Sequence, residues 1–136
     1  MKLATLKNGS RDGRLVVVSR NLQRAVDAAA VAPTMQHAIE NWAQVEPGLQ
    51  ALYEQLNEGQ GASAFDFDPV QAMSPLPRTH QFVDASAFLN HGKIMEEAYQ
   101  LDVKKTPGIP VLVQRQSDDF LGPCDDYPFP TEADNA

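Results

Sequence analysis

The first twenty residues, MKLATLKNGSRDGRLVVVSR, contain two apolar runs separated by a polar cluster. The cluster, residues 8–13, is rich in Asn, Gly, Ser and Asp, which favour turns and tolerate positive backbone φ angles. Val16, Val17 and Val18 are contiguous and β-branched, as in a strand buried on both faces or paired at a sheet edge. The pattern therefore predicts two strands joined by a turn. Residues 24–33, RAVDAAAVAP, favour a further short strand and a turn that ends at Pro33.

A helical pattern follows Thr34, which is a suitable N-cap residue. Apolar residues then recur at spacings of three and four and define one amphipathic stripe: Met35, Ala38, Ile39, Trp42, Val45, Leu49, Leu52, Tyr53 and Leu56. Pro47 interrupts the stripe, so it either kinks one helix or opens a second helix at its first position. Gly59 and Gly61 are expected to end the helix. We expect the stripe to pack in the core rather than to hold a cofactor.

Residues 62–80 contain Pro69, Pro75 and Pro77 and are predicted to form an extended linker, with a domain boundary near Pro77. Beyond it, residues 80–84 favour a short strand, residues 84–101 a helix and residues 111–114 a second strand. The last twenty residues read as loop. The expected fold class is α+β, with a small N-terminal β-hairpin and helix domain over residues 1–77. Residues 78–136 would then be the first segments of an incomplete, mixed-β catalytic domain.

Charge is distributed unevenly along the 136-residue chain, whose formal net charge is −7. Basic side chains predominate in residues 1–33, whereas the last twenty residues carry only acidic charges. The two ends are therefore expected to attract each other, to attract a metal ion at the C-terminal end, or to leave that end as a solvated acidic tail. A chain this acidic is a poor candidate for binding nucleic acid or an anionic membrane.

Other features of the sequence bear on its location and chemistry. The single cysteine, Cys124, excludes an internal disulfide, and neither a signal peptide nor a membrane-spanning run is expected. The simplest prediction is a soluble cytoplasmic protein. Neighbouring aspartates make Cys124 a poor nucleophile, since their charge disfavours the thiolate. His37 and His80 belong to no paired pattern, and we expect them to be structural.

Asp84 and His91 are the candidates for chemistry because of their spacing. In a helix they would lie within about 20° of each other around the axis and roughly 10 Å apart along it. Asp84 is expected to cap a helix, to bind a hard cation, or to do both. His91 is expected to be a packed or half-exposed side chain or a general base. Glu96 and Glu97 lie too far round the helix to orient it, so a base would need a carboxylate from elsewhere.

Three stretches, MKLATLKNGSRDGRLVVVSR, FVDASAFLNH and SDDFLGP, resemble the beginning of bacterial fumarylacetoacetate hydrolase (fumarylacetoacetase) family proteins. The resemblance follows essentially the whole chain in order. It implies hydrolysis of a carbon–carbon bond in a 1,3-diketo acid during breakdown of tyrosine and related aromatic compounds. In such enzymes a histidine oriented by a glutamate activates water, and bound Mg²⁺ or Ca²⁺ stabilises the departing enolate.

By resemblance, Asp84 is the first metal ligand, His91 is the catalytic base, and Arg115 and Ser117 contact the substrate. A tyrosine and glycines expected before the SDDF stretch are replaced by Val113, Gln114, Arg115 and Gln116, so a substrate-binding hydroxyl is expected to be missing. The resemblance places the family's Glu-x-Glu ligands, a further aspartate ligand, a lysine and most of the catalytic β-fold beyond residue 136.

We therefore expect this chain alone to bind no metal and to be inactive, with apolar surface exposed around residues 111–113. Its expected partners are a diketo acid in the complete enzyme, a complementing catalytic segment or a second copy of itself. The alternatives are a non-catalytic interaction module, the product of a truncated gene, or an unrelated binding domain.

Overall fold

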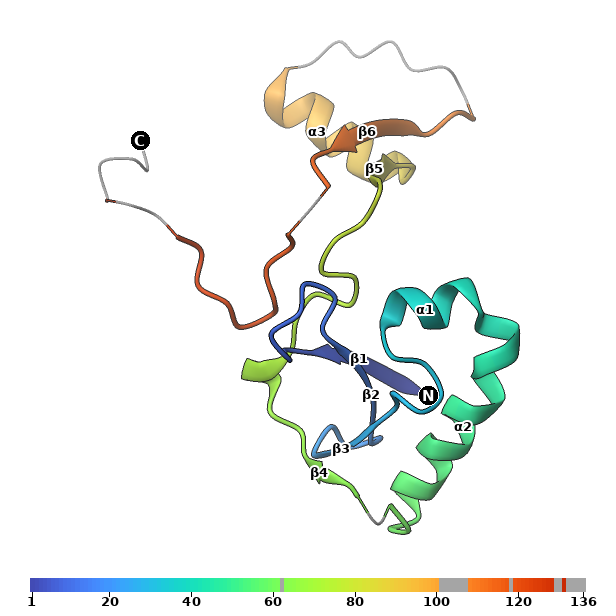
Figure 1. Ribbon diagram of the computed structural model, residues 1–136. Helices are drawn as coiled ribbons and strands as arrows, with labels where there is room; N and C mark the ends of the chain where they lie inside the picture. The colour runs from blue at the N-terminus through green and yellow to red at the C-terminus, as the bar shows by residue number, and fades with distance from the viewer. Residues whose placement is uncertain (62, 101–107, 118, 129–130, 132–136) are drawn as a thin grey trace. The chain divides into compact units, whose positions relative to one another are not determined.

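The computed structural model describes residues 1–61, 63–100, 108–117, 119–128 and 131 (Figure 1). The chain forms two compact units. The first comprises Met1–Arg78 together with Asp118–Ala136, and the second comprises Thr79–Ser117. Both combine helix with antiparallel strands, which confirms the α+β class.

The first unit is built on a four-stranded antiparallel sheet. Its strands are β1 (Lys2–Leu6), β2 (Arg14–Val18), β3 (Arg24–Asp27) and β4 (Phe65–Asp66), in the order β1-β2-β3-β4. The predicted hairpin is confirmed by the pairing of β1 with β2, in which Ala4 lies opposite Val16. Since β2 also pairs with β3, it is hydrogen-bonded along both sides.

Both faces of β2 are covered, which explains its unbroken apolar sequence. Leu15 and Val17 point to one face and pack against residues of the two helices that follow, forming the larger core. Val16 and Val18 point to the opposite face and pack with Leu6, Ala25 and Ala72 in a smaller core. The residues Leu15, Val16 and Val17 are completely buried.

The predicted helical stripe forms two helices, α1 (Met35–Glu40) and α2 (Trp42–Asn57), which lie to one side of the sheet in Figure 1. Thr34 caps α1 as predicted, its hydroxyl accepting a hydrogen bond from the His37 backbone N–H. The break falls at Asn41, and Pro47 lies inside α2 rather than opening it. Most of the stripe is buried or half-buried, as predicted, but Ile39 and Trp42 beside the break are exposed.

The prediction of a linker over residues 62–80 is wrong for its central part. Phe65 pairs with Ala25 of β3, and after a short 3₁₀ turn (η1, Pro69–Gln71) Ala72 bridges to Leu6 of β1. The segment therefore lies along both outer edges of the sheet. The prolines obscured this pairing, because each removes only its own backbone N–H and allows its neighbours to hydrogen-bond.

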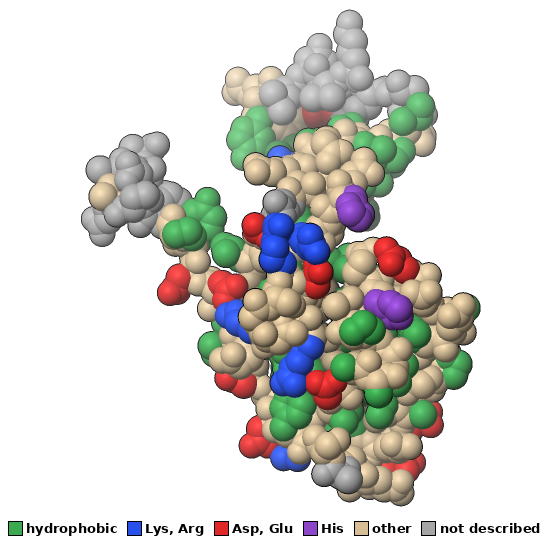
Figure 2. Space-filling model, in the orientation of Figure 1, with side chains coloured by type: hydrophobic (Ala, Val, Ile, Leu, Met, Phe, Trp, Pro, Cys, Tyr) green, Lys and Arg blue, Asp and Glu red, His purple; other side chains and the backbone are tan. Residues whose placement is uncertain are grey.

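The C-terminal segment, residues 119–128, returns to the first unit although the sequence placed it in the second domain. Lys7 Nζ lies 2.6 Å from Asp125 Oδ1, and Arg11 Nη2 lies 2.9 Å from Asp119 Oδ1. The Phe120 backbone N–H donates to the Pro77 carbonyl at 2.7 Å. Of the three expectations raised by the uneven charge, attraction between the two ends is the one confirmed. Figure 2 shows basic and acidic side chains lying next to each other on this unit.

The second unit has a two-stranded antiparallel sheet of β5 (Phe82–Ser86) and β6 (Val111–Arg115), with the helix α3 (Leu89–Tyr99) between them in sequence. Every residue of both strands is exposed, including Val111, Leu112 and Val113, so the predicted apolar surface is confirmed. Among the described residues, none of the helices combines the length and apolar character required to cross a lipid bilayer.

Substitution of Gly13 tests how tightly the first hairpin packs around this position. Its φ is +62°, and an added Cβ would lie 2.6 Å from Thr5 Cγ2 and 2.7 Å from the Leu6 carbonyl oxygen. We expect Gly13→Ala to lower the free energy of unfolding by about 2–5 kcal/mol, the sum of overpacking and left-handed backbone costs. Gly9 has φ +84° and open space around it, so Gly9→Ala should cost only about 1–2 kcal/mol. Urea unfolding of both variants measures the difference, and equal losses would contradict it.

Asp125 provides a test of the contact between the two ends. The Lys7 ammonium and the Gly122 backbone N–H both donate hydrogen bonds to the Asp125 carboxylate. These contacts, the one from Lys7 above all, lower the pKa of Asp125 below the ordinary 3.8. Because the folded state favours the ionised form, the stabilisation is present above the ordinary pKa and is lost as the pH falls through the lowered one. We expect Lys7→Gln to raise the pKa of Asp125, as followed by NMR titration of the carboxyl carbon. The control Lys2→Gln should leave it unchanged, since Lys2 donates to the Arg20 carbonyl instead.

Candidate functional site

Asp84 lies in the middle of strand β5, and not at the start of a helix. It is opposite Val113 of β6 in the antiparallel register, and helix α3 begins only at Leu89 after Phe88. The helix predicted over residues 84–101 is therefore wrong in its first part. Pairing with a strand almost thirty residues later makes this stretch extended, and such a partner is invisible to local pattern analysis.

The prediction that Asp84 and His91 lie on one face of a single helix is therefore wrong. Asp84 is on a strand, and His91 is in the first turn of α3, with the side chains of both residues open to solvent. Among the described residues, no hydrogen bond or ion pair joins them. A strand followed directly by a helix still carries both residues in one compact unit, so their roles as metal ligand and base remain predictions.

The structure does bring Asp84 together with Arg115. Both project from the same face of the two-stranded sheet, and Arg115 Nη2 lies 2.9 Å from Asp84 Oδ2. The Asp84 side chain is 47% exposed and the Arg115 side chain is 55% exposed, so solvent weakens the attraction between them. The residue predicted to hold a metal is thus paired with one predicted to contact substrate. An incoming cation would have to compete with the guanidinium for this carboxylate.

Ser117 follows β6 and is half-buried at the end of the second unit. Within the part of the chain that the structure describes, no group of three or more His, Cys, Asp or Glu residues is arranged to hold a metal ion. His37 and His80, expected to be structural, are exposed, and Cys124 is an exposed free thiol. The described second unit therefore presents separate polar groups rather than an enclosed reaction centre.

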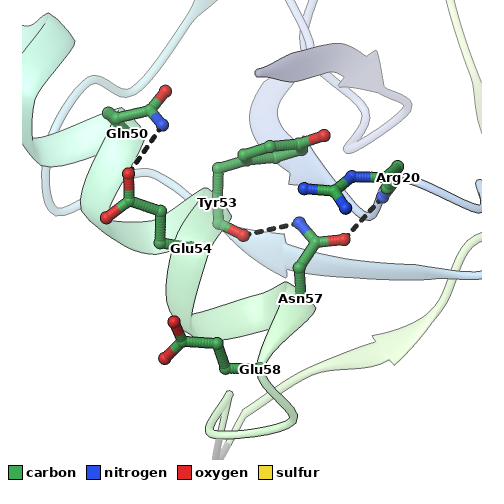
Figure 3. Close-up of a pocket in the computed structure, with 6 residues that line it drawn as sticks. All are labelled: Arg20, Gln50, Tyr53, Glu54, Asn57 and Glu58. Atoms are coloured by element: carbon green, nitrogen blue, oxygen red, sulfur yellow. Dashed lines mark hydrogen bonds between the residues drawn. The ribbon is translucent and has the colours of Figure 1, made fainter.

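A cleft that the sequence did not predict lies on the first unit (Figure 3). Its volume is about 310 Å³, and it is formed by the turn after β2 and the last turns of α2. The lining residues are Arg20, Gln50, Tyr53, Glu54, Asn57 and Glu58. Gln50, Glu54 and Glu58 recur at spacings of four along the end of α2 and its C-cap, which is a sequence signal for a polar stripe. Nothing local to Arg20 indicates that its backbone N–H approaches Asn57 of this helix.

The family model described as fumarylacetoacetase N-terminal domain 2 matches residues 1–78, more than half of the chain. The chain belongs to this family. A search of curated proteins gave no match. The fumarylacetoacetase N-terminal domain thus ends at Arg78, where the first continuous stretch of the first unit also ends. Asp84, His91, Arg115 and Ser117 all follow the matched region.

The ion pair at Asp84 leads to a prediction about cation binding. Replacing Arg115 by Gln removes the competing positive charge, so we expect Ca²⁺ to bind more tightly at Asp84 in R115Q than in the wild-type chain. The Ca²⁺ dependence of the Asp84 backbone amide shift in NMR measures this. Arg24→Gln is a matched control, because Arg24 pairs with Asp66 of the first sheet. Equal Ca²⁺ responses in R115Q and R24Q would contradict the prediction.

Proposed function

We propose that this chain supplies the N-terminal domain and the first catalytic segments of a fumarylacetoacetase-type hydrolase. The observation that carries the proposal is the family match over residues 1–78, followed at once by a strand with Asp84 and a helix with His91. The reaction would be metal-assisted hydrolysis of a carbon–carbon bond in a 1,3-diketo acid, in the breakdown of tyrosine or related aromatic compounds. A cytoplasmic setting is part of the same proposal.

In this proposal the residues of the second unit have distinct roles. His91 takes a proton from the attacking water, and Asp84 offers a carboxylate oxygen to the cation. Bound Mg²⁺ or Ca²⁺ would stabilise negative charge on the leaving enolate. Arg115 and Ser117 would contact the substrate, Arg115 by exchanging its ion pair with Asp84 for a substrate carboxylate.

Activity in this proposal depends on a further catalytic segment that contacts the second unit. Asp84 is an oxygen donor suited to a hard cation, but one carboxylate already paired with a guanidinium is too little to displace the hydration shell. His91 is fully open to solvent, whereas a general base works best in a site from which bulk water is excluded. The additional ligands, the orienting carboxylate and the walls of the site would come from that segment.

Mixing experiments test the proposed reaction. We expect the chain alone to show no hydrolysis of fumarylacetoacetate with Mg²⁺ or Ca²⁺. Activity should appear when a fumarylacetoacetase fragment that begins after the equivalent region is added. His91→Ala should then lower kcat by at least about 100-fold, the usual effect of losing a general base.

Control variants at neighbouring residues test whether the effects are specific to His91 and Asp84. His80→Ala removes another exposed histidine of the second unit and should leave the mixture active. Asp84→Asn should raise the Mg²⁺ concentration needed for half-maximal rate, whereas Glu97→Gln should not. Turnover by the chain alone that His91→Ala abolishes would overturn the need for a second segment. Full activity of the His91→Ala mixture would overturn the assignment of the base.

A non-catalytic interaction module is the second candidate, and the exposed surface of the second unit favours it. Large hydrophobic side chains are exposed on both strands and on α3, and Figure 2 shows hydrophobic side chains at the surface of this unit. A two-stranded sheet is marginal in water without a further strand or layer against it. The unit would then serve as a docking surface for a partner or for a second copy of the chain.

Sedimentation equilibrium tests this second candidate through Leu112, which is 63% exposed. We expect the wild-type chain to self-associate and Leu112→Lys to shift it towards monomer, because the substitution places a charge in the apolar surface. Gln116→Lys adds the same charge at an exposed polar position just beyond β6 and should not change the association. A wild-type chain that stays monomeric at high concentration would contradict the expectation.

A further inference from the structure

The turn between β1 and β2, drawn in dark blue in Figure 1, presents an asparagine whose side chain is held against its own backbone. Asn8, Gly9 and Ser10 follow one another in this turn, and all three are exposed. Asn8 is the only asparagine of the sequence that is followed by glycine. The turn belongs to the first unit and the proposed catalytic residues to the second, so the inference is independent of the proposed reaction.

Two hydrogen bonds are made to the side-chain carbonyl oxygen of Asn8. The Ser10 backbone N–H donates to Oδ1 at 2.9 Å, and the Ser10 hydroxyl donates to the same atom at 2.7 Å. The first bond is that of an Asx turn, in which the asparagine side chain folds back over the peptide bond that follows it. Both donors withdraw electron density from the carbonyl and make its carbon, Cγ, more electrophilic. They also stabilise negative charge that develops on the oxygen when a nucleophile attacks.

The backbone nitrogen of Gly9 is the nucleophile closest to this carbonyl along the chain. A bond between the Gly9 nitrogen and Asn8 Cγ closes the small ring of a succinimide, so the two groups react within one molecule. Among the described residues, the Gly9 N–H donates no hydrogen bond that would have to be broken first. Gly9 has no side chain to obstruct the approach, and the space where a Cβ would lie is open.

Asn21 has the same hydrogen-bonding pattern but lacks the glycine. Its Oδ1 accepts from the Ser19 hydroxyl at 2.7 Å and from the Gln23 backbone N–H at 3.2 Å. The residue that follows it is Leu22, whose branched side chain crowds the neighbouring nitrogen. Asn21 is exposed as well, so the chain contains a matched internal control for the effect of the glycine.

We propose that Asn8 is a site of self-modification, in which water converts its amide to a carboxylate after attack by the Gly9 nitrogen. The Gly9 nitrogen loses its proton to solvent and bonds to Asn8 Cγ. The bond from Cγ to the side-chain nitrogen breaks, and this nitrogen takes a proton from solvent and leaves as ammonia. Water then opens the succinimide. Opening at the side-chain carbonyl gives aspartate, and opening at the main-chain carbonyl gives isoaspartate, in which the main chain runs through the former side chain.

The modification alters the turn that holds the C-terminal segment. Lys7, next to the site, pairs with Asp125, and Arg11 of the same turn pairs with Asp119. A new carboxylate adds a negative charge between these two cations in the sequence, and isoaspartate also lengthens the main chain by a methylene group. Both changes act where residues 119–125 are held.

Peptide mapping by mass spectrometry of the full chain, incubated at neutral pH, tests the proposal. We expect the peptide that contains Asn8 to gain about 1 Da and to include isoaspartate, which a protein isoaspartyl methyltransferase labels. Asn21 should stay unmodified over the same period. Aspartate without isoaspartate would overturn the attack by Gly9, because direct hydrolysis by water leaves the main chain unchanged. An Asn8 that stays unmodified, or that reacts no faster than Asn21, would overturn the proposal.

Variants of Ser10 test whether the turn itself promotes the reaction. Ser10→Ala should slow the loss of Asn8 by about threefold to tenfold, the effect of one hydrogen bond. Ser10→Thr keeps the hydroxyl and should react at nearly the wild-type rate, and Ser63→Ala removes an exposed serine outside the turn and should have no effect. In guanidinium chloride, where the turn is unfolded, Ser10→Ala and the wild type should react equally. A faster reaction of folded Ser10→Ala would overturn the proposal, since the hydrogen bonds would then protect the amide.

Discussion

The first unit depends on the burial of both faces of strand β2. Its five residues are hydrogen-bonded to β1 on one side and, over Val16 to Val18, to β3 on the other. Because side chains alternate between the faces, one strand contributes to both hydrophobic cores at once. Each of its buried Val and Leu side chains stabilises the fold by about 1.5–3 kcal/mol. The helices cover one face, and the returning segment around Phe65 and Ala72 covers the other.

Later segments of the first unit pair with the outer sides of β1 and β3. The segment that looked like a linker lies along the free edges of β1 and β3, where exposed backbone groups would otherwise invite association with other chains. The C-terminal segment then lies on the same unit through Lys7, Arg11 and their acidic partners. Side chains of opposite charge from the two ends of the sequence thus form ion pairs. Solvent exposure limits the contribution of these ion pairs to stability.

The second unit has the opposite character. None of the residues described in its strands and helix is buried. Asp84 and Arg115 form an exposed ion pair on this unit. Such a unit is suited to completion by another polypeptide segment, whether that segment brings metal ligands or only a complementary apolar surface.

The sequence by itself determined the elements whose signals are local: the hairpin of β1 and β2, the short strand β3, the cap at Thr34 and the apolar stripe over α1 and α2. It also carried the family signature of residues 1–78. Only the tertiary structure decided that Asp84 is extended, because its strand partner Val113 lies twenty-nine positions away. The same holds for the edge pairing of Ala72 and for the approach of Arg20 to α2. Local propensity reports on neighbours in the chain, whereas these three placements depend on hydrogen bonds and contacts between distant segments.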